Sequence, residues 1–226
     1  MDLAANVAPV GAPAVPGNRG IWVGILCEMS EFALMFLAWA WFRHGHPEDF
    51  RAGPAMLNAG AGVANTAVML TSGYFAVRAL LAIRRDDAIA ARNWLVAALL
   101  GGLTFLLIKA LEFRWNIEHG VVGTGNSFVA MYYYLTFNHL VHVVWGCLGL
   151  IWAILRAQFG AYGAADHEGL EAAVLYWHAT DLAWIVIFPL LYVLHSTGCH
   201  DEYRRKPGDH RVARAPRADP GQRVVG

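Results

Sequence analysis

Glutamates occur in a stretch of this sequence that is otherwise apolar. Glu28 and Glu31 stand three residues apart in GILCEMSEF, and on a helix that spacing makes their side chains neighbours. A charged side chain at the centre of a bilayer costs about 2.5–3.5 kcal/mol on insertion scales, so such residues are functional candidates. Two close carboxylates cannot both ionise cheaply. The pair therefore indicates either a proton or lipid-headgroup site, or one glutamate bonded to a neighbouring helix and one near the interface.

Histidines offer a second kind of chemistry. His139 and His142 stand three residues apart in NHLVHVVWG and could ligate a metal ion together, or one of them could share a haem with His178. Zinc, copper and haem sites usually need a fuller ligand set, and the sequence contains no H-E-x-x-H, C-x-x-C or C-x-x-C-H motif. We therefore interpret these histidines as bonded across helices. We predict no catalytic, metal-binding or cofactor-binding residue in this chain.

Two more polar groups complete the candidates. Lys109 and Glu112 have the spacing of an ion pair within one helix, and we interpret them as a structural pair near the interface. In EAAVLYWHATDLAW, Glu171 precedes His178 by two turns and Asp181 follows it by one. This pattern indicates a polar seam buried against other helices, without a nucleophile motif. We also expect Glu112 and His142 to belong to one interhelical polar network.

The elements that position these residues are membrane helices. Of the 226 residues, 57% are hydrophobic and 15% are charged, which is typical of an integral membrane protein. A span across about 30 Å of hydrocarbon needs about 20 mostly apolar residues, and lipid cannot satisfy an open sheet edge. The sequence therefore predicts an all-α membrane protein with five transmembrane helices, at 20–42, 56–83, 90–113, 127–155 and 170–194.

The two ends of the chain differ from these spans. We predict a flexible N-terminal tail over residues 1–18, a transmembrane domain over 19–197 and a basic flexible C-terminal tail over 198–226. Positive and negative side chains are equal in number, 17 of each. This balance gives no electrostatic surface for nucleic acid, so we expect no nucleic-acid partner.

Taken in order, the five spans resemble subunit III of the haem–copper oxidases, a family that includes cytochrome c oxidase subunit III and the nitric oxide reductase E protein. The resemblance places the family's membrane carboxylate on Glu28, leaves Glu31 as an addition, and places a second family glutamate on Glu112. It departs from the family where Leu80 and Leu81 replace a histidine pair. The segments that carry it are GIWVGILCEMSEFALMFLAWAWF, NTAVMLTSG, GLTFLLIKALEF, HLVHVVWG and EAAVLYWHATDLAW.

The resemblance implies the five-helix bacterial form, with a two-plus-three bundle around a lipid-filled cleft. Such a subunit packs on catalytic subunit I, together with subunit II, and has bound phospholipid but no redox centre, because haem and copper belong to the partner. It also implies a bacterial inner-membrane location with a cytoplasmic N-terminus. The expected roles are to stabilise subunit I, to hold lipid and to aid proton uptake. The candidates for proton or lipid contacts are Glu28, Glu31, Glu112, His139, His142, Glu171, His178 and Asp181.

Other functions stay open at this point. A standalone transporter could use Glu28 and Glu31 as a proton path, and a haem-binding membrane protein could use the histidines as ligands. An assembly factor would lack cofactors too, but would leave the mature complex. The enzyme served, an oxidase or a nitric oxide reductase, is also open.

Overall fold

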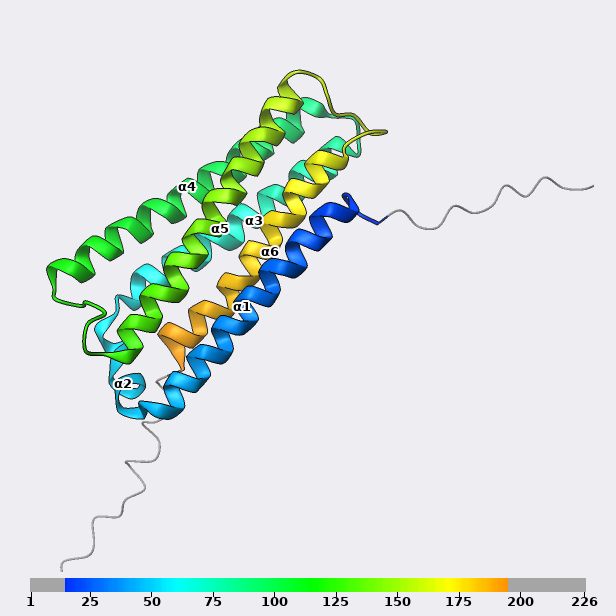
Figure 1. The fold of residues 1–226 in the computed structure, drawn as a ribbon. Coiled ribbons are helices and arrows are strands. Elements are labelled where there is room, and N and C mark those ends of the chain that lie inside the picture. The colour runs from blue at the N-terminus through cyan, green and yellow to red at the C-terminus, as the bar shows by residue number, and fades with distance from the viewer. Residues whose placement is uncertain (1–14, 195–226) are drawn as a thin grey trace, which may run out of the picture. The chain divides into compact units, whose positions relative to one another are not determined.

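The computed structural model describes residues 15–194 (Figure 1). Five helical spans in this part are long and apolar enough to cross a membrane, and the described residues contain no strand. These findings confirm the predicted all-α membrane fold with five spans. The spans are α1 (Arg19–Gly45), α3 (Ala59–Ile83), α4 (Ala88–Glu118), α5 (Ser127–Gln158) and α6 (Glu168–Phe188), which continues as the π-helical turn η2 (Pro189–Val193).

Short polar side chains fix where most of these helices begin. Four spans follow an Asn or Asp whose side-chain oxygen accepts a hydrogen bond from the backbone N–H three residues later, at 2.8–3.1 Å. Each cap satisfies a backbone donor that the first turn leaves unpaired. Because Asn58 is such a cap, the second span begins at Ala59 and not at residue 56 as predicted. The other caps are Asn18, Asp87 and Asn126.

The segment between the first two spans is more ordered than the sequence suggested. It forms α2 (Pro47–Ala52) and a 3₁₀ turn, η1 (Gly53–Met56), where we expected only a connector. Pro47 at the first helical position, followed by two acidic residues, is the signal that could have predicted α2. The ring of Phe50 packs edge-on between Trp39 and Phe128, with centroids at 5.4 and 5.5 Å. The short helix thus ties α1 to α5.

The expected bundle of five helices is confirmed, and the contacts between the described helices show how its members are grouped. Helices α3, α4, α5 and α6 form a closed ring in which each contacts two neighbours, and α1 lies outside this ring along α5 and α6 (Figure 1). Small residues explain the ring, because they let helix backbones approach closely. The indole N–H groups of Trp177 and Trp184 also donate to Ser72 and Thr66 of α3, at 3.1 and 3.0 Å. The arrangement is therefore four plus one.

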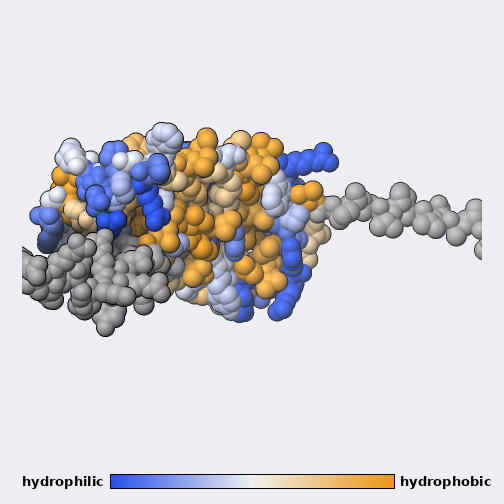
Figure 2. Space-filling view, turned by 90° about the horizontal axis from the view of Figure 1, so that it is seen from below, coloured by the Kyte–Doolittle hydropathy of each residue, from blue (hydrophilic) through white to orange (hydrophobic). Residues whose placement is uncertain are grey.

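The surface has the distribution that a membrane protein needs. Figure 2 shows apolar side chains gathered over the middle of the bundle and hydrophilic ones towards its two ends. Long aliphatic side chains within the spans, such as Leu34, Leu107 and Leu182, are well exposed. The chain is therefore a multi-pass membrane protein, and its polar groups within the spans must be explained one by one.

The predicted tails fall largely outside the described residues. Residues 1–14 and 195–226 are not described, and α1 begins at Arg19. The division into tails at 1–18 and 198–226 therefore stays a prediction.

Candidate functional site

A sealed ionic cluster joins α4 to α5 and to the turn after α6. The Lys109 ammonium lies 3.0 Å from one carboxylate oxygen of Glu112 and donates to the Tyr192 hydroxyl at 2.8 Å. The other oxygen of Glu112 accepts from the hydroxyls of Tyr192 and Tyr132, at 2.6 and 2.8 Å. The Lys109 ammonium also lies 5.1 Å from the ring centroids of Tyr132 and Trp184.

This cluster has the features of a structural site. The side chains of Lys109 and Glu112 are both 0% exposed, and both oxygens of Glu112 have partners inside the ring. The interpretation of these two residues as an ion pair agrees with the structure. The expected network of Glu112 with His142 is not formed within residues 15–194, because His142 bonds to the Asn138 carbonyl and approaches Glu31, while Glu112 bonds to Lys109, Tyr132 and Tyr192.

The first of the two α1 glutamates to consider is Glu31, which reaches α5. One oxygen accepts from the Asn138 side-chain amide at 2.7 Å, and the other lies 3.9 Å from Nε2 of His142. The His142 ring packs on Phe32 with centroids at 4.9 Å. The Glu31 side chain is 52% exposed, so it lies at the edge of the helix contact. Glu31, which the sequence analysis treated as an addition to the family pattern, thus bonds α1 to α5.

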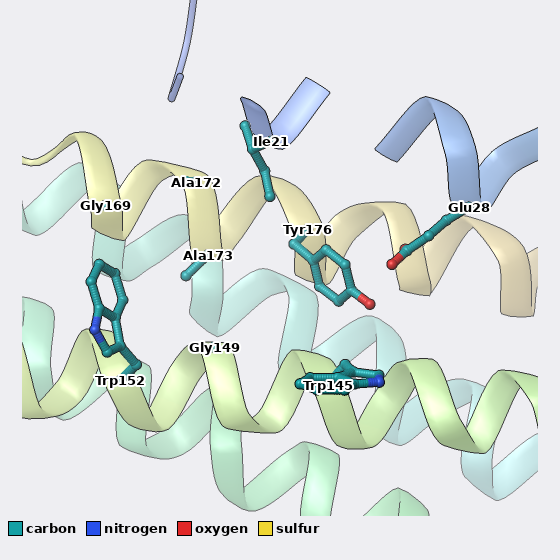
Figure 3. A pocket seen from close by; sticks show the side chains of 9 residues that line it. All are labelled: Ile21, Glu28, Trp145, Gly149, Trp152, Gly169, Ala172, Ala173 and Tyr176. Atoms are coloured by element: carbon teal, nitrogen blue, oxygen red, sulfur yellow. The ribbon is translucent and has the colours of Figure 1, made fainter. Parts of the chain in front are cut away.

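Glu28 faces α6 from the previous turn of α1. Its carboxylate points towards the Tyr176 hydroxyl, which is placed to hydrogen-bond to it (Figure 3). Both groups line a groove of 420 Å³ between α1, α5 and α6. At 1.5 Å of rise per residue, Glu28 lies about 14 Å from the start of α1, well inside the hydrocarbon. The rest of the lining is Ile21, Trp145, Gly149, Trp152, Gly169, Ala172 and Ala173.

The three candidate histidines have three different surroundings. His139 is fully buried and stacks on Trp184 at 5.2 Å, edge-on to Phe105 at 5.5 Å. His142 lies at the α1–α5 contact, and His178 bonds through Nδ1 to the Val174 carbonyl at 2.8 Å. Within residues 15–194, no group of three or more His, Cys, Asp and Glu side chains could hold a metal ion. Both ring nitrogens of His139 lack a hydrogen-bond partner within residues 15–194, so the three histidines share no common set of partners there.

The remaining candidates separate along α6. Glu171 does not share a seam with His178: it accepts from Arg84 at 2.7 Å and from the Gly17 backbone N–H at 2.8 Å. It thereby connects the ends of α3 and α6 to the residues before α1. His178 and Asp181 instead line a second groove, of 530 Å³, between α3 and α6.

Three participants in these sites were not singled out from the sequence. Tyr132 and Tyr192 lie in apolar stretches without a motif around them, and Asn138 opens the segment NHLVHVVWG but was not among the candidates. Asn138 directly precedes the candidate His139, and a buried amide in a span needs a partner. That signal could have drawn attention to Asn138, whereas the two tyrosines gave none.

Comparison with known proteins adds an independent result. The model of the family described as cytochrome c oxidase subunit III matches residues 2–196. A cytochrome c oxidase subunit 3 from Synechocystis sp. is 31% identical over 176 residues, which are 77% of this chain and 74% of that protein. A probable cytochrome c oxidase subunit 3 from Mycobacterium tuberculosis is 27% identical over 175 residues, 77% and 86% of the two chains. A probable quinol oxidase subunit 3 from Staphylococcus epidermidis is 25% identical over 178 residues, 77% and 87% of the two chains.

Proposed function

Because the chain belongs to the cytochrome c oxidase subunit III family, we propose that it is the non-catalytic subunit III of a haem–copper terminal oxidase in a bacterial inner membrane. It packs on catalytic subunit I, in a complex with subunit II, and stabilises subunit I. Haem and copper belong to the partner, and the N-terminus is cytoplasmic. The observation that carries this proposal is the family match over residues 2–196, which includes all five spans.

Copurification tests the assignment. The tagged chain is isolated from its native membrane in a mild detergent, and its partners and visible spectrum are recorded. We expect a haem-containing catalytic subunit in the complex and no Soret band from the chain expressed alone. A Soret band of the isolated chain that disappears in His178→Ala would support the haem-binding alternative. The identity of the copurified subunit also distinguishes an oxidase from a nitric oxide reductase. Absence of the tagged chain from the mature complex would indicate that the chain is an assembly factor.

The groove beside α1 suggests how the subunit holds lipid. Its lining is mostly apolar, and it extends from the end of α6 that carries Gly169 to the level of Glu28 (Figure 3). A phospholipid acyl chain can follow this path, because most of the surface it would meet is aliphatic or aromatic. The Glu28 carboxyl then lies beside the acyl chain and not beside the headgroup. A carboxyl at that depth can carry a proton, and we propose that Glu28 aids proton uptake by the complex.

Replacing Glu28 separates these roles. Glu28→Gln keeps the size of the side chain and a hydrogen bond with Tyr176, so the complex should still assemble. We expect its turnover to fall most at high pH, where protons are scarce. Glu118→Gln, at an exposed residue paired with Arg114 at one end of α4, is the control and should leave the pH profile unchanged. Unchanged turnover with altered copurified phospholipid would assign Glu28 to lipid alone, and no change in either would leave it a packing role.

A further inference from the structure

Among the candidate carboxylates of the described residues, Asp181 stands out because one of its oxygens is buried without a partner. The residue is 6% exposed, and its Oδ1 is sealed from the surface without a hydrogen-bond partner. Within residues 15–194, its carboxylate forms no ion pair either, whereas Glu31, Glu112 and Glu171 all have partners. A buried polar group without a partner is costly and uncommon in native proteins. Because Oδ1 is sealed, an external partner would have to bind through the part of the carboxyl that lines the groove between α3 and α6.

The surroundings of Asp181 show what is missing. A side chain at residue 73 would collide with Oδ2 of Asp181, so Gly73 lets the carboxylate lie directly against α3. Its neighbour His178 uses Nδ1 to bond to the Val174 carbonyl. In the neutral ring this bond makes Nδ1 the donor and leaves Nε2 as an acceptor. Nε2 of His178 is an acceptor, and the Asp181 carboxyl has an oxygen that accepts in either protonation state, so the partner that fits both is a hydrogen-bond donor.

The depth of the groove restricts where that donor comes from. Asp181 is the fourteenth residue of the span Glu168–Val193, about 20 Å from its start at helical rise. Lipid headgroups do not reach the centre of the hydrocarbon, and acyl chains carry no donor. The other groove residues are mainly apolar and open to the outside, with Leu70 and Leu182 53% and 55% exposed. An apolar transmembrane helix with one polar side chain can bring a donor to this depth and can also cover the apolar lining of the groove.

We propose that the groove between α3 and α6 binds a transmembrane helix of the catalytic subunit, which inserts a donor side chain between Asp181 and His178. This inference rests on the proposed function and adds the face by which the subunit docks. Gly73 and the groove admit the donor, and Leu70, Val77, Leu182 and Ile185 provide the apolar contact around it. The helix supplies a hydrogen-bond partner that the carboxyl lacks within residues 15–194.

Site-specific photocrosslinking tests the docking face in the intact complex. A benzophenone amino acid is placed at Leu70 or Leu182, and in control variants at Leu34 of α1 or Leu107 of α4, which are leucines at least as exposed as the first two. We expect crosslinks to the catalytic subunit from the first two positions and at least tenfold fewer from the controls. An intact complex that gives no crosslink from Leu70 or Leu182 would overturn the inference and leave the proposed function in place. Failure of the unsubstituted chain to copurify with a catalytic subunit would instead contradict the function.

Substitution of Asp181 tests the donor. Asp181→Leu fills the same space without an acceptor and should lower the catalytic subunit retained on the tagged chain at least tenfold after a detergent wash. Asp181→Asn keeps one acceptor oxygen and should retain an intermediate amount. Thr180→Val is the matched control, because Thr180 bonds only to the Tyr176 carbonyl of its own helix. Full retention by Asp181→Leu would contradict the proposed bond, and thermal unfolding of the isolated variants verifies that each one folds.

Discussion

Glu112 and Glu31 both lie within membrane-spanning helices, yet their surroundings are opposite. The Glu112 side chain is 0% exposed and accepts hydrogen bonds from Lys109, Tyr132 and Tyr192. The Glu31 side chain is half exposed and has one close bond, to Asn138, and a longer approach to His142. The first carboxylate is completed inside the ring of four helices, and the second lies where α1 meets that ring.

The difference separates structure from candidate function. A charge that is desolvated and fully paired can hold helices together but has no free position for a proton or a ligand. A carboxylate at an open contact, such as Glu31 or its neighbour Glu28 beside the groove, keeps room for both. The position in the four-plus-one arrangement, more than the residue type, decides which role a glutamate has.

The largest expected effect is in the sealed cluster. Glu112→Ala leaves the Lys109 ammonium buried without its anion and should lower the free energy of unfolding by about 3–5 kcal/mol. Unfolding of the detergent-solubilised protein, followed by circular dichroism, measures this loss. Glu118→Ala breaks an exposed pair with Arg114 and should cost less than about 1 kcal/mol.

A double variant refines this prediction. Lys109→Met combined with Glu112→Leu removes both charges and should cost less than Glu112→Ala alone, because no charge is left unpaired. A double variant at least as unstable as the single one would show that the hydrogen bonds of Tyr132 and Tyr192, and not the charge pairing, dominate the cluster.

Much of the fold could be predicted from the sequence because it depends on local signals. Five long apolar stretches predict five spans, and Asn58 and Asp87 are local signals for helix starts at Ala59 and Ala88, although the predicted starts at 56 and 90 did not use them. The Lys109–Glu112 pair follows from their spacing within one helix. Each of these signals acts over a few residues, so it can be found without knowing how the helices pack.

The candidate site depends on packing and was predicted only in part. Tyr192 joins Lys109 across 83 residues, and Asn138 joins Glu31 across 107. No spacing rule connects such residues, because their contact exists only after the ring has closed and α1 has docked. For the same reason, the sequence could not show that Glu171 has different partners from His178 and Asp181. All three lie on α6, and the sequence pattern placed them in one seam.

A smaller effect on stability is expected from two glycines of α5, one inside the packed ring of helices and one beside the groove next to α1. A Cβ added to Gly146 would lie 2.7 Å from the Trp177 ring in the packed ring of helices, whereas one added to Gly149 would meet no atom within 4 Å. Gly146→Ala should therefore cost about 1–3 kcal/mol through overpacking, and Gly149→Ala should not destabilise the protein. The two variants differ by one helical turn on α5 and make a matched pair for the same unfolding measurement. Equal stability of both would mean that α6 can shift freely, against the distinction between a closed ring and an open groove.

The smallest expected effect measures how firmly α1 is held by Glu31. A double-mutant cycle of Glu31→Ala and Asn138→Ala should give a coupling of about 0.6 kcal/mol, the average for polar contacts between membrane helices. The value should not approach that of the sealed cluster, because Glu31 has one close hydrogen-bond partner where Glu112 has three. Ser30→Ala with Asn138→Ala is the control cycle, since Ser30 bonds only to the Leu26 carbonyl of its own helix, and its effects should add. A coupling above about 2 kcal/mol for Glu31 and Asn138 would make this contact as structural as the Lys109–Glu112 pair, and α1 would then be a fifth member of the bundle core.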